Sequence, residues 1–111
     1  MPTLPNGLTI EDTLEGSGEP CPKGAIITIH YRGTLLDGTQ FDSSYPGMPV
    51  TFPLNRLITG WQEGIPGMKA GGKRTLTIPW QMAYGEDGAP PDIPARANLI
   101  FEIELFSFRT K

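Results

Sequence analysis

The residues that carry the most chemical information in this sequence are aromatic side chains from separate segments, together with one carboxylate. The aromatic residues are Tyr31, Phe41, Trp61, Tyr84 and Phe101. Asp42 follows Phe41 directly, and a carboxylate beside apolar side chains needs hydrogen-bond donors, for which the hydroxyl of Tyr31 is a candidate. Such a set predicts a mainly apolar pocket for a compact ligand. Core packing alone is the competing interpretation, because aromatic side chains mostly fill cores.

Metal and nucleophile chemistry have little support in the sequence. The single histidine, His30, and the single cysteine, Cys21, do not show the ligand spacing of a zinc site. The Gly-x-Ser-x-Gly motif of serine hydrolases is absent. His30 is expected to be a packed or solvent-facing residue in the middle of a strand. We therefore expect no bound metal and no cofactor.

A pair of acids, Glu102 and Glu104, lies two residues apart and therefore on one strand face. Paired carboxylates can perform acid-base catalysis. Lys73, Arg74 and Arg109 are nevertheless available to pair with these acids across neighbouring strands. A solvated strand face is the interpretation that we favour.

The composition indicates a compact, loop-rich globular protein. The chain has 111 residues, with 14 glycines and 12 prolines that stand between apolar runs. This length suits one domain over residues 1–111, in which residues 1–6 form a loose terminus. Nine basic and twelve acidic residues give a net charge of -3 without a long basic cluster, so nucleic acid is a poor partner.

The sequence also bears on the cellular setting. A single cysteine rules out an internal disulfide, and the first residues lack the basic and apolar regions of a signal peptide. No apolar stretch approaches the roughly 18 residues that a membrane span needs. We expect a monomer in the reducing cytoplasm, without a membrane partner.

Alternating apolar residues predict the strands. They cover residues 8–14, 25–36, 39–43, 50–54, 74–80 and 99–108. Asp37 and Gly38 form a preferred hairpin turn between the second and third of these segments. Residues 82–96 form a loop rich in Gly, Pro and Ala, and loops of that length are usually functional or mobile.

Only one segment shows helical periodicity. Leu57, Trp61 and Ile65 recur every four residues, which predicts a helix from residue 56 to about residue 63 with Asn55 as its N-cap. About five antiparallel strands with one short helix across a face give an α+β domain. We expect Trp61, which stands on this helix, to form the floor of a pocket between the helix and the sheet.

Several motifs occur together and in order. They are Ile-His-Tyr-Arg-Gly (29–33), Leu-Asp-Gly-Thr-Gln-Phe-Asp-Ser-Ser (36–44), Gly-Trp-Gln-Glu-Gly (60–64), Gly-Met-Lys (67–69), Gly-Lys-Arg-Thr-Leu-Thr-Ile (72–78), Ala-Tyr-Gly (83–85), Ile-Pro (93–94) and Leu-Ile-Phe-Glu-Ile-Glu-Leu (99–105). In these segments the sequence closely resembles the FKBP family, the macrolide-binding peptidyl-prolyl isomerases. The resemblance implies a strongly bent antiparallel sheet wrapped around one short helix, and acceleration of rotation about Xaa-Pro peptide bonds.

The resemblance also implies roles for individual residues. The implied catalytic residues are Tyr31, Phe41, Asp42, Trp61, Tyr84 and Phe101. The implied ligand-binding residues are Val50, Leu57, Ile58, Ala89 and Ile93. The backbone N–H of Ile58 and the hydroxyl of Tyr84 would each hold a ligand carbonyl. Many members carry an arginine after Ser44 that pairs with the aspartate, whereas residues 45–49 here contain no basic residue.

The partners that the resemblance implies are proline-containing peptides, unfolded proteins and macrolides such as tacrolimus and rapamycin. Val50 occupies a wall position that is often aromatic, and Asp92 a position that is often aliphatic. These departures keep a second hypothesis open. In it, the chain is a binding module with little turnover that docks a protein partner through the pocket or through the 82–96 loop.

Overall fold

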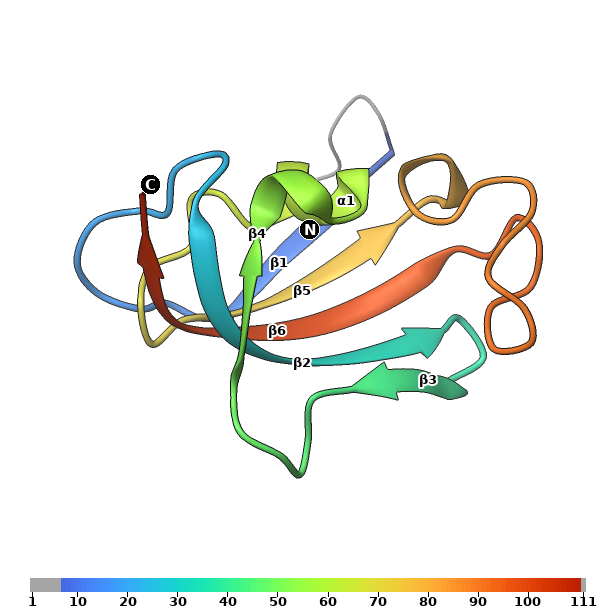
Figure 1. Cartoon of the computed structure of the whole chain (residues 1–111), viewed down its shortest axis with the longest axis horizontal. Coiled ribbons are helices and arrows are strands. Elements are labelled where there is room, and N and C mark those ends of the chain that lie inside the picture. Colours follow the sequence, from blue (N-terminus) through green and yellow to red (C-terminus); the bar gives the residue numbers. More distant parts are fainter. Residues whose placement is uncertain (1–6, 111) are drawn as a thin grey trace.

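The computed structural model describes residues 7–110, so the predicted loose terminus at residues 1–6 lies outside the described residues. The elements in chain order are β1 (Thr9–Leu14), β2 (Ile26–Leu35), β3 (Gln40–Ser43), β4 (Val50–Pro53), the 3-10 turn η1 (Leu54–Arg56), α1 (Thr59–Gly64), β5 (Lys73–Ile78), the 3-10 turn η2 (Trp80–Met82) and β6 (Leu99–Arg109). Figure 1 shows the sheet bent around α1. This confirms the predicted α+β fold, with six strands in place of about five.

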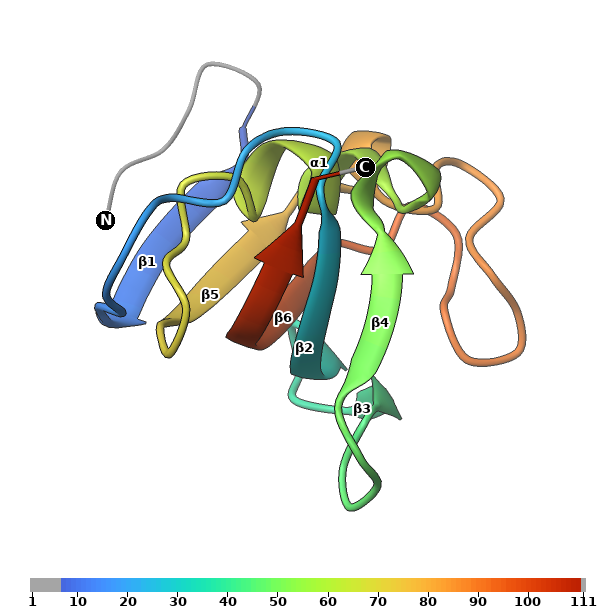
Figure 2. The same cartoon turned by 60° about the vertical axis from the view of Figure 1, so that its left-hand side comes forward.

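The sheet is antiparallel and has the strand order β1-β5-β6-β2-β3, with β4 paired to β2 as well. β4 pairs with the first half of β2, from Ile26 to Ile29, and β3 pairs with the second half, from Arg32 to Thr34. A shift of register between Thr28 and Ile29 interrupts the β2–β6 ladder. Because such irregularities bend strands and increase twist, β2 curls. β4 lies beside the first half of β2 and runs toward α1 (Figure 2).

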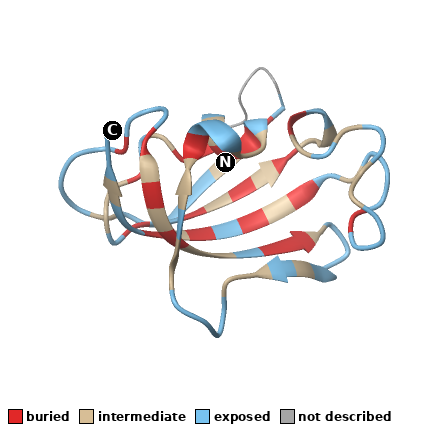
Figure 3. Cartoon of the chain, in the orientation of Figure 1, coloured by how far each residue is buried: buried red, intermediate tan, exposed pale blue. Residues whose placement is uncertain are grey.

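The buried face of the sheet is the one toward α1. Along β6 the expected alternation is confirmed: Leu99, Phe101, Ile103 and Leu105 are buried, and Glu102 between them is exposed. Figure 3 shows the resulting bands of buried residues along the central strands and beneath α1. Among residues 7–110 no helix is long and apolar enough to cross a membrane.

The helix begins later than its periodicity predicts. Residues 54–56 form the 3-10 turn η1, Leu57 then adopts an extended conformation with φ -99° and ψ 172°, and α1 starts only at Thr59. The predicted N-cap, Asn55, is therefore wrong: the N-cap of α1 is Ile58, whose side chain makes no capping hydrogen bond. Instead, Gln62 Nε2 donates 2.6 Å to the carbonyl of Leu57. Because the chain is extended between η1 and α1, the side chains of Leu57 and Ile58 face the sheet.

The glycines on both sides of Trp61 allow α1 to approach the sheet closely. A Cβ atom on Gly60 would lie 2.5 Å from the side chain of Ile78, and one on Gly64 would lie 2.8 Å from Leu76. Neither distance leaves room for a methyl group. The close approach of α1 packs Trp61 against the sheet.

The outer face of the sheet is polar. Glu102 pairs with Arg32 of β2, with 3.1 Å between Nη1 and Oε2, and not with the expected Lys73, Arg74 or Arg109. Arg74 cannot serve there because it lies on the inner face, where it is 9% exposed and pairs with Asp12. His30 is structural, as predicted: its Nδ1 lies 2.6 Å from Ser44 Oγ, and its ring stacks on Tyr45 at 4.3 Å.

Candidate active site

A hollow of about 130 Å³ opens between α1 and the curled sheet. Side chains from both layers and from the adjoining loops line it. They are Tyr31 from β2, Asp42 from β3, Phe52 from β4, Leu57 and Ile58 from the segment before α1, Trp61 from α1, Tyr84 from the loop after η2, and Phe101 from β6. Most of these side chains are apolar or aromatic, and Asp42 is the one that carries a charge.

Trp61 forms the floor of this hollow and is 5% exposed. Its ring meets Tyr31 at 5.3 Å, Phe52 at 6.3 Å and Phe101 at 5.0 Å between centroids, each time edge to face. Edge-to-face contacts favour a fixed ring orientation. The indole Nε1 is buried and has no oxygen or nitrogen partner among the described atoms. The floor is therefore rigid and apolar.

A glycine on β2 makes room for the aromatic wall. A Cβ atom on Gly33 would lie 2.7 Å from both Phe41 and Phe101. Phe41 contacts Phe101 edge to face at 5.5 Å and thus supports it from behind. Gly33 ends the Ile-His-Tyr-Arg-Gly motif at residues 29–33, and only the fold brings it close to the two rings.

Asp42 is held by neutral donors. The hydroxyl of Tyr31 donates to Asp42 Oδ2 over 2.9 Å, and the N–H of Ser43 donates to Oδ1 over 2.8 Å. Burial, followed by the hydrogen bond to Asp42 and the charge of Asp42, raises the pKa of Tyr31 from 10.0 to about 12. Tyr31 is therefore protonated at neutral pH and remains a donor to the carboxylate. The partner expected for Asp42 from the sequence is the one that the structure places beside it.

Two donors at the hollow remain free. Among residues 7–110, neither the N–H of Ile58 nor the hydroxyl of Tyr84 donates to another group. Tyr84 is 41% exposed, and burial together with the charge of Asp42 raises its pKa, so that it too is protonated at neutral pH. The backbone around it is fixed by hydrogen bonds from Gly85 N–H to Trp80 and from Arg96 N–H to Gly85. The site thus offers donors to a ligand that brings carbonyl oxygens.

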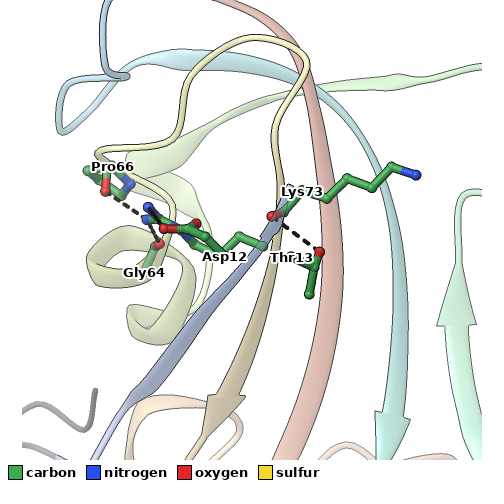
Figure 4. A network of polar contacts seen from close by, with 6 residues as sticks. Asp12, Thr13, Gly64, Pro66 and Lys73 are labelled. Carbon is green, nitrogen blue, oxygen red and sulfur yellow. Dashed lines mark hydrogen bonds and ion pairs between the residues drawn. The ribbon is translucent and has the colours of Figure 1, made fainter. Parts of the chain in front are cut away.

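The C-terminal end of α1 is held by a buried arginine. Arg74 Nη1 donates to the carbonyls of Gly64 at 2.8 Å and Pro66 at 3.2 Å. Its Nε and Nη2 donate to the carboxylate of Asp12 on β1, at 2.6 and 3.3 Å. Figure 4 shows Asp12 close to Gly64 and Pro66 at the end of the helix. This network attaches the helix that carries Trp61 to the edge of the sheet.

Comparison with known proteins agrees with this geometry. Residues 18–106 match the family described as FKBP-type peptidyl-prolyl cis-trans isomerase. The chain belongs to this family. It is 52% identical over 102 residues to the FK506-binding protein of Neisseria meningitidis serogroup B, covering 89% of this chain and 94% of the relative. It is 50% identical over 108 residues to FK506-binding protein 4 of Rhizopus delemar, covering 96% of this chain but only 28% of that longer protein.

Solved structures of FKBP-type proteins have the same fold. The crystal structure of AtFKBP13 has a TM-score of 0.89 at 40% identity, over 96% of this chain and 97% of that one. The crystal structure of FkpA from Escherichia coli has a TM-score of 0.92 at 39% identity, over 98% of this chain and 51% of that one. Relatives named as FKBP-type peptidyl-prolyl cis-trans isomerases support the same activity for this chain: isomerisation of Xaa-Pro peptide bonds.

The structure brings most of the expected FKBP site residues together, but not all of them. Four residues expected at the site do not line the hollow: Phe41, Val50, Ala89 and Ile93. Ile93 is 5% exposed and belongs to the core, and its backbone pairs with that of Ala89 through two hydrogen bonds of 2.9 Å. The loop that contains them folds back on itself at this pair, which draws Ile93 into the core. Their roles in ligand binding remain predictions.

Phe52 also lines the hollow, although it was not among the site residues predicted from the sequence. Val50 was expected to form this wall, and it is half-buried opposite Ile29 in the β4–β2 ladder. Phe52 lies two residues further along the same strand face and closer to α1, where its ring meets Tyr31 and Trp61 at 6.3 Å. The alternation of Val50 and Phe52 was the signal that could have found it.

Proposed function

We propose that the hollow receives the proline ring of an Xaa-Pro peptide and lowers the barrier to rotation about the preceding peptide bond. The observation that carries this proposal is the pairing of an apolar floor with two free donors, the Ile58 N–H and the Tyr84 hydroxyl. The described residues that line it include no serine, cysteine, histidine or lysine. Such a site suits a reaction in which no covalent bond is made or broken.

The physical basis is the resonance of the amide. The planar peptide bond has partial double-bond character, and rotation about it crosses a barrier of about 18–20 kcal/mol. In the perpendicular transition state that resonance is lost, so the carbonyl oxygen carries less charge. The planar amide therefore gives up more hydration than the twisted amide on entering an apolar site. Each tenfold acceleration requires only about 1.4 kcal/mol of preferential binding to the twisted state.

The roles of individual residues follow from this mechanism. Trp61 and Phe101 contact the proline ring, and Phe52 closes the side of the hollow next to them. The Ile58 N–H and the Tyr84 hydroxyl orient the carbonyls on the two sides of the bond that rotates. Asp42 is a polar wall held by Tyr31, and not a general base, because the rotation transfers no proton.

Exchange between the cis and trans forms of a short Xaa-Pro peptide tests the proposal. At substoichiometric protein, NMR line broadening or exchange cross-peaks are expected for the proline signals, and Trp61→Ala is expected to reduce the exchange rate. The absence of exchange with a folded protein would overturn the proposal. It would favour the binding module that docks a partner through the hollow or through residues 82–96.

We also propose that macrolides such as tacrolimus and rapamycin occupy the same hollow. Support comes from relatives of this chain that are named FK506-binding proteins. The chain has a second tryptophan, Trp80, which lies 5.8 Å from the guanidinium of Arg96 and outside the hollow. In a Trp80→Phe variant the fluorescence of Trp61 is expected to change when rapamycin binds. An unchanged signal, together with no heat of binding, would contradict the proposal.

The cellular setting is a proposal as well. We propose a monomer in the reducing cytoplasm that acts on exposed proline sites of unfolded proteins. The single cysteine, Cys21, is free and buried, which fits a reducing compartment. Cell fractionation and size-exclusion chromatography test these two statements separately.

A further inference from the structure

Among residues 7–110, Asp42 is the single charged side chain that lines the hollow. Both of its oxygens are held, but by neutral donors: the Tyr31 hydroxyl and the Ser43 N–H. The ion pairs among residues 7–110 use other acids, namely Asp12, Glu63, Glu86 and Glu102. The carboxylate of Asp42 is therefore fixed in place and lacks a cationic partner within the described part of the chain.

The neighbouring basic residues do not supply that partner. Arg32 follows Tyr31 in β2, but strand alternation places it on the outer face, where it pairs with Glu102. Arg56 precedes Leu57 at the end of η1 and is exposed, and it forms no ion pair with a described residue. Neither arginine lines the hollow.

The small size of the hollow determines which residues of a bound peptide lie close to Asp42. A space of about 130 Å³ holds little more than one proline ring, so the residues on either side of a bound proline lie at its rim. A long lysine or arginine side chain on one of them can reach within the Debye length of about 8 Å from Asp42 at physiological ionic strength. Asp42 itself is exposed, so water and salt screen the interaction and keep it modest.

We infer that this isomerase prefers proline sites that carry a lysine or arginine directly before or after the proline, and that Asp42 sets this preference. The inference rests on the proposed function and names its substrate class. The size of the effect is bounded by the exposure of Asp42. A partly exposed ion pair of this kind corresponds to a roughly two- to five-fold difference in kcat/KM, which decreases as salt is added.

Peptides that differ by one ammonium group give the test. Lysine and norleucine share a linear alkyl side chain, so their comparison isolates the charge. Peptides with either residue before or after the proline are compared by NMR exchange, at low salt and at about 0.5 M salt, where the Debye length falls well below 8 Å. The lysine peptide is expected to exchange two- to five-fold faster in at least one position at low salt, and the ratio is expected to approach one at high salt.

Variants of the protein test whether Asp42 causes the preference for lysine over norleucine. Asp42→Asn is expected to bring the lysine-to-norleucine ratio to one, whatever it does to the absolute rate, and Asp42→Glu is expected to keep a ratio above one. Glu11→Gln is the matched control, because it removes the same charge from β1, at the opposite end of the strand order from β3. Four strand spacings, or about 19 Å measured along the sheet, separate β1 from β3. The control is expected to keep the wild-type ratio.

The outcomes separate this inference from the proposed function. No exchange of the norleucine peptide would overturn the function itself. Exchange with equal rates for lysine and norleucine at both positions would overturn the charge preference alone, and so would a ratio that survives in Asp42→Asn. If Asp42→Asn lacks measurable turnover, the ratio of peptide dissociation constants, obtained by chemical-shift titration, replaces the ratio of rates.

Discussion

Arg74 Nη1 donates a hydrogen bond of 2.8 Å to the carbonyl oxygen of Gly64, the last residue of α1, while its Nε pairs with Asp12 at 2.6 Å. One buried guanidinium thus joins an edge strand to the short helix that carries Trp61. A helix of six residues has little stability of its own, and no side chain caps its N-terminus. The position of the pocket floor therefore depends on contacts such as this one.

Replacing Arg74 by methionine is expected to lower the free energy of unfolding by about 2–4 kcal/mol, because it leaves a carboxylate and two carbonyls without their donor. Urea denaturation measures the change. Arg32→Met is the matched control: its ion pair with Glu102 is exposed, and its loss is expected to cost less than about 1 kcal/mol. Equal losses for the two variants would contradict a special role for Arg74.

The close contact between Gly60 and Ile78 gives a second prediction. Gly60→Ala would place a Cβ atom 2.5 Å from the Ile78 side chain, so the helix has to move or the isoleucine has to change conformation. Overpacking of this kind is expected to destabilise the protein by about 1–3 kcal/mol. The displaced Trp61 is also expected to reduce the rate of peptide exchange.

A double-mutant cycle with Ile78→Ala checks the cause. If the clash is the reason, the smaller side chain accommodates the new methyl group, and the double variant is more stable than the sum of the two single changes predicts. Strict additivity in urea denaturation would show that Gly60→Ala acts through something other than this contact.

Local patterns in the sequence predicted the strands well, because alternation is a local property. β6 is the clearest case, since its buried and exposed residues follow the predicted order. The start of the helix could not be predicted in this way. Leu57 has the right spacing from Trp61 for a helix, yet its backbone is extended and places it at the hollow. The spacing indicated that the side chains of Leu57 and Trp61 face the same way, and not that both residues lie in one helix.

Contacts between distant segments were beyond the sequence patterns. Arg74 and Asp12 are 62 positions apart, and nothing local indicates that this arginine faces inward. The resemblance to known FKBP-type proteins named seven of the eight residues that line the hollow, and it named Val50 and not Phe52 on β4. How far the hollow extends along β4 depends on where α1 sits over the sheet, and that placement selects Phe52.

Variants of Val50 and Phe52 in β4 test which of the two residues forms the wall of the hollow. Phe52→Ala removes an aromatic wall of the hollow, and the loss of apolar contact is expected to lower kcat/KM about 5- to 30-fold, equivalent to about 1–2 kcal/mol. Val50→Ala removes a side chain that does not line the hollow, and its kcat/KM is expected to stay within about two-fold of the wild type. A larger effect at Val50 than at Phe52 would return the wall to the position that the sequence indicated.

The bond between Tyr31 and Asp42 predicts a dependence of stability on alkaline pH. The pKa of Tyr31 in the fold, about 12, lies above its ordinary value of 10.0, so the folded state holds this proton more tightly than the unfolded state does. The resulting stabilisation is complete below pH 10 and is lost as the pH rises toward 12. Tyr31→Phe lacks the ionisable group and the hydrogen bond, and is expected to be less stable by about 1 kcal/mol at neutral pH.

This difference in stability between the wild type and Tyr31→Phe is expected to shrink between pH 10 and pH 12, because only the wild type loses the contribution of Tyr31. Urea midpoints of both proteins across that range measure it, and ultraviolet titration of the phenol groups should show that the variant lacks one late-titrating tyrosine. Tyr84 and Tyr45, whose pKa values are also raised, are present in both proteins and cancel in the comparison. A constant difference up to pH 12 would mean that the Tyr31 hydroxyl does not hold its proton for Asp42.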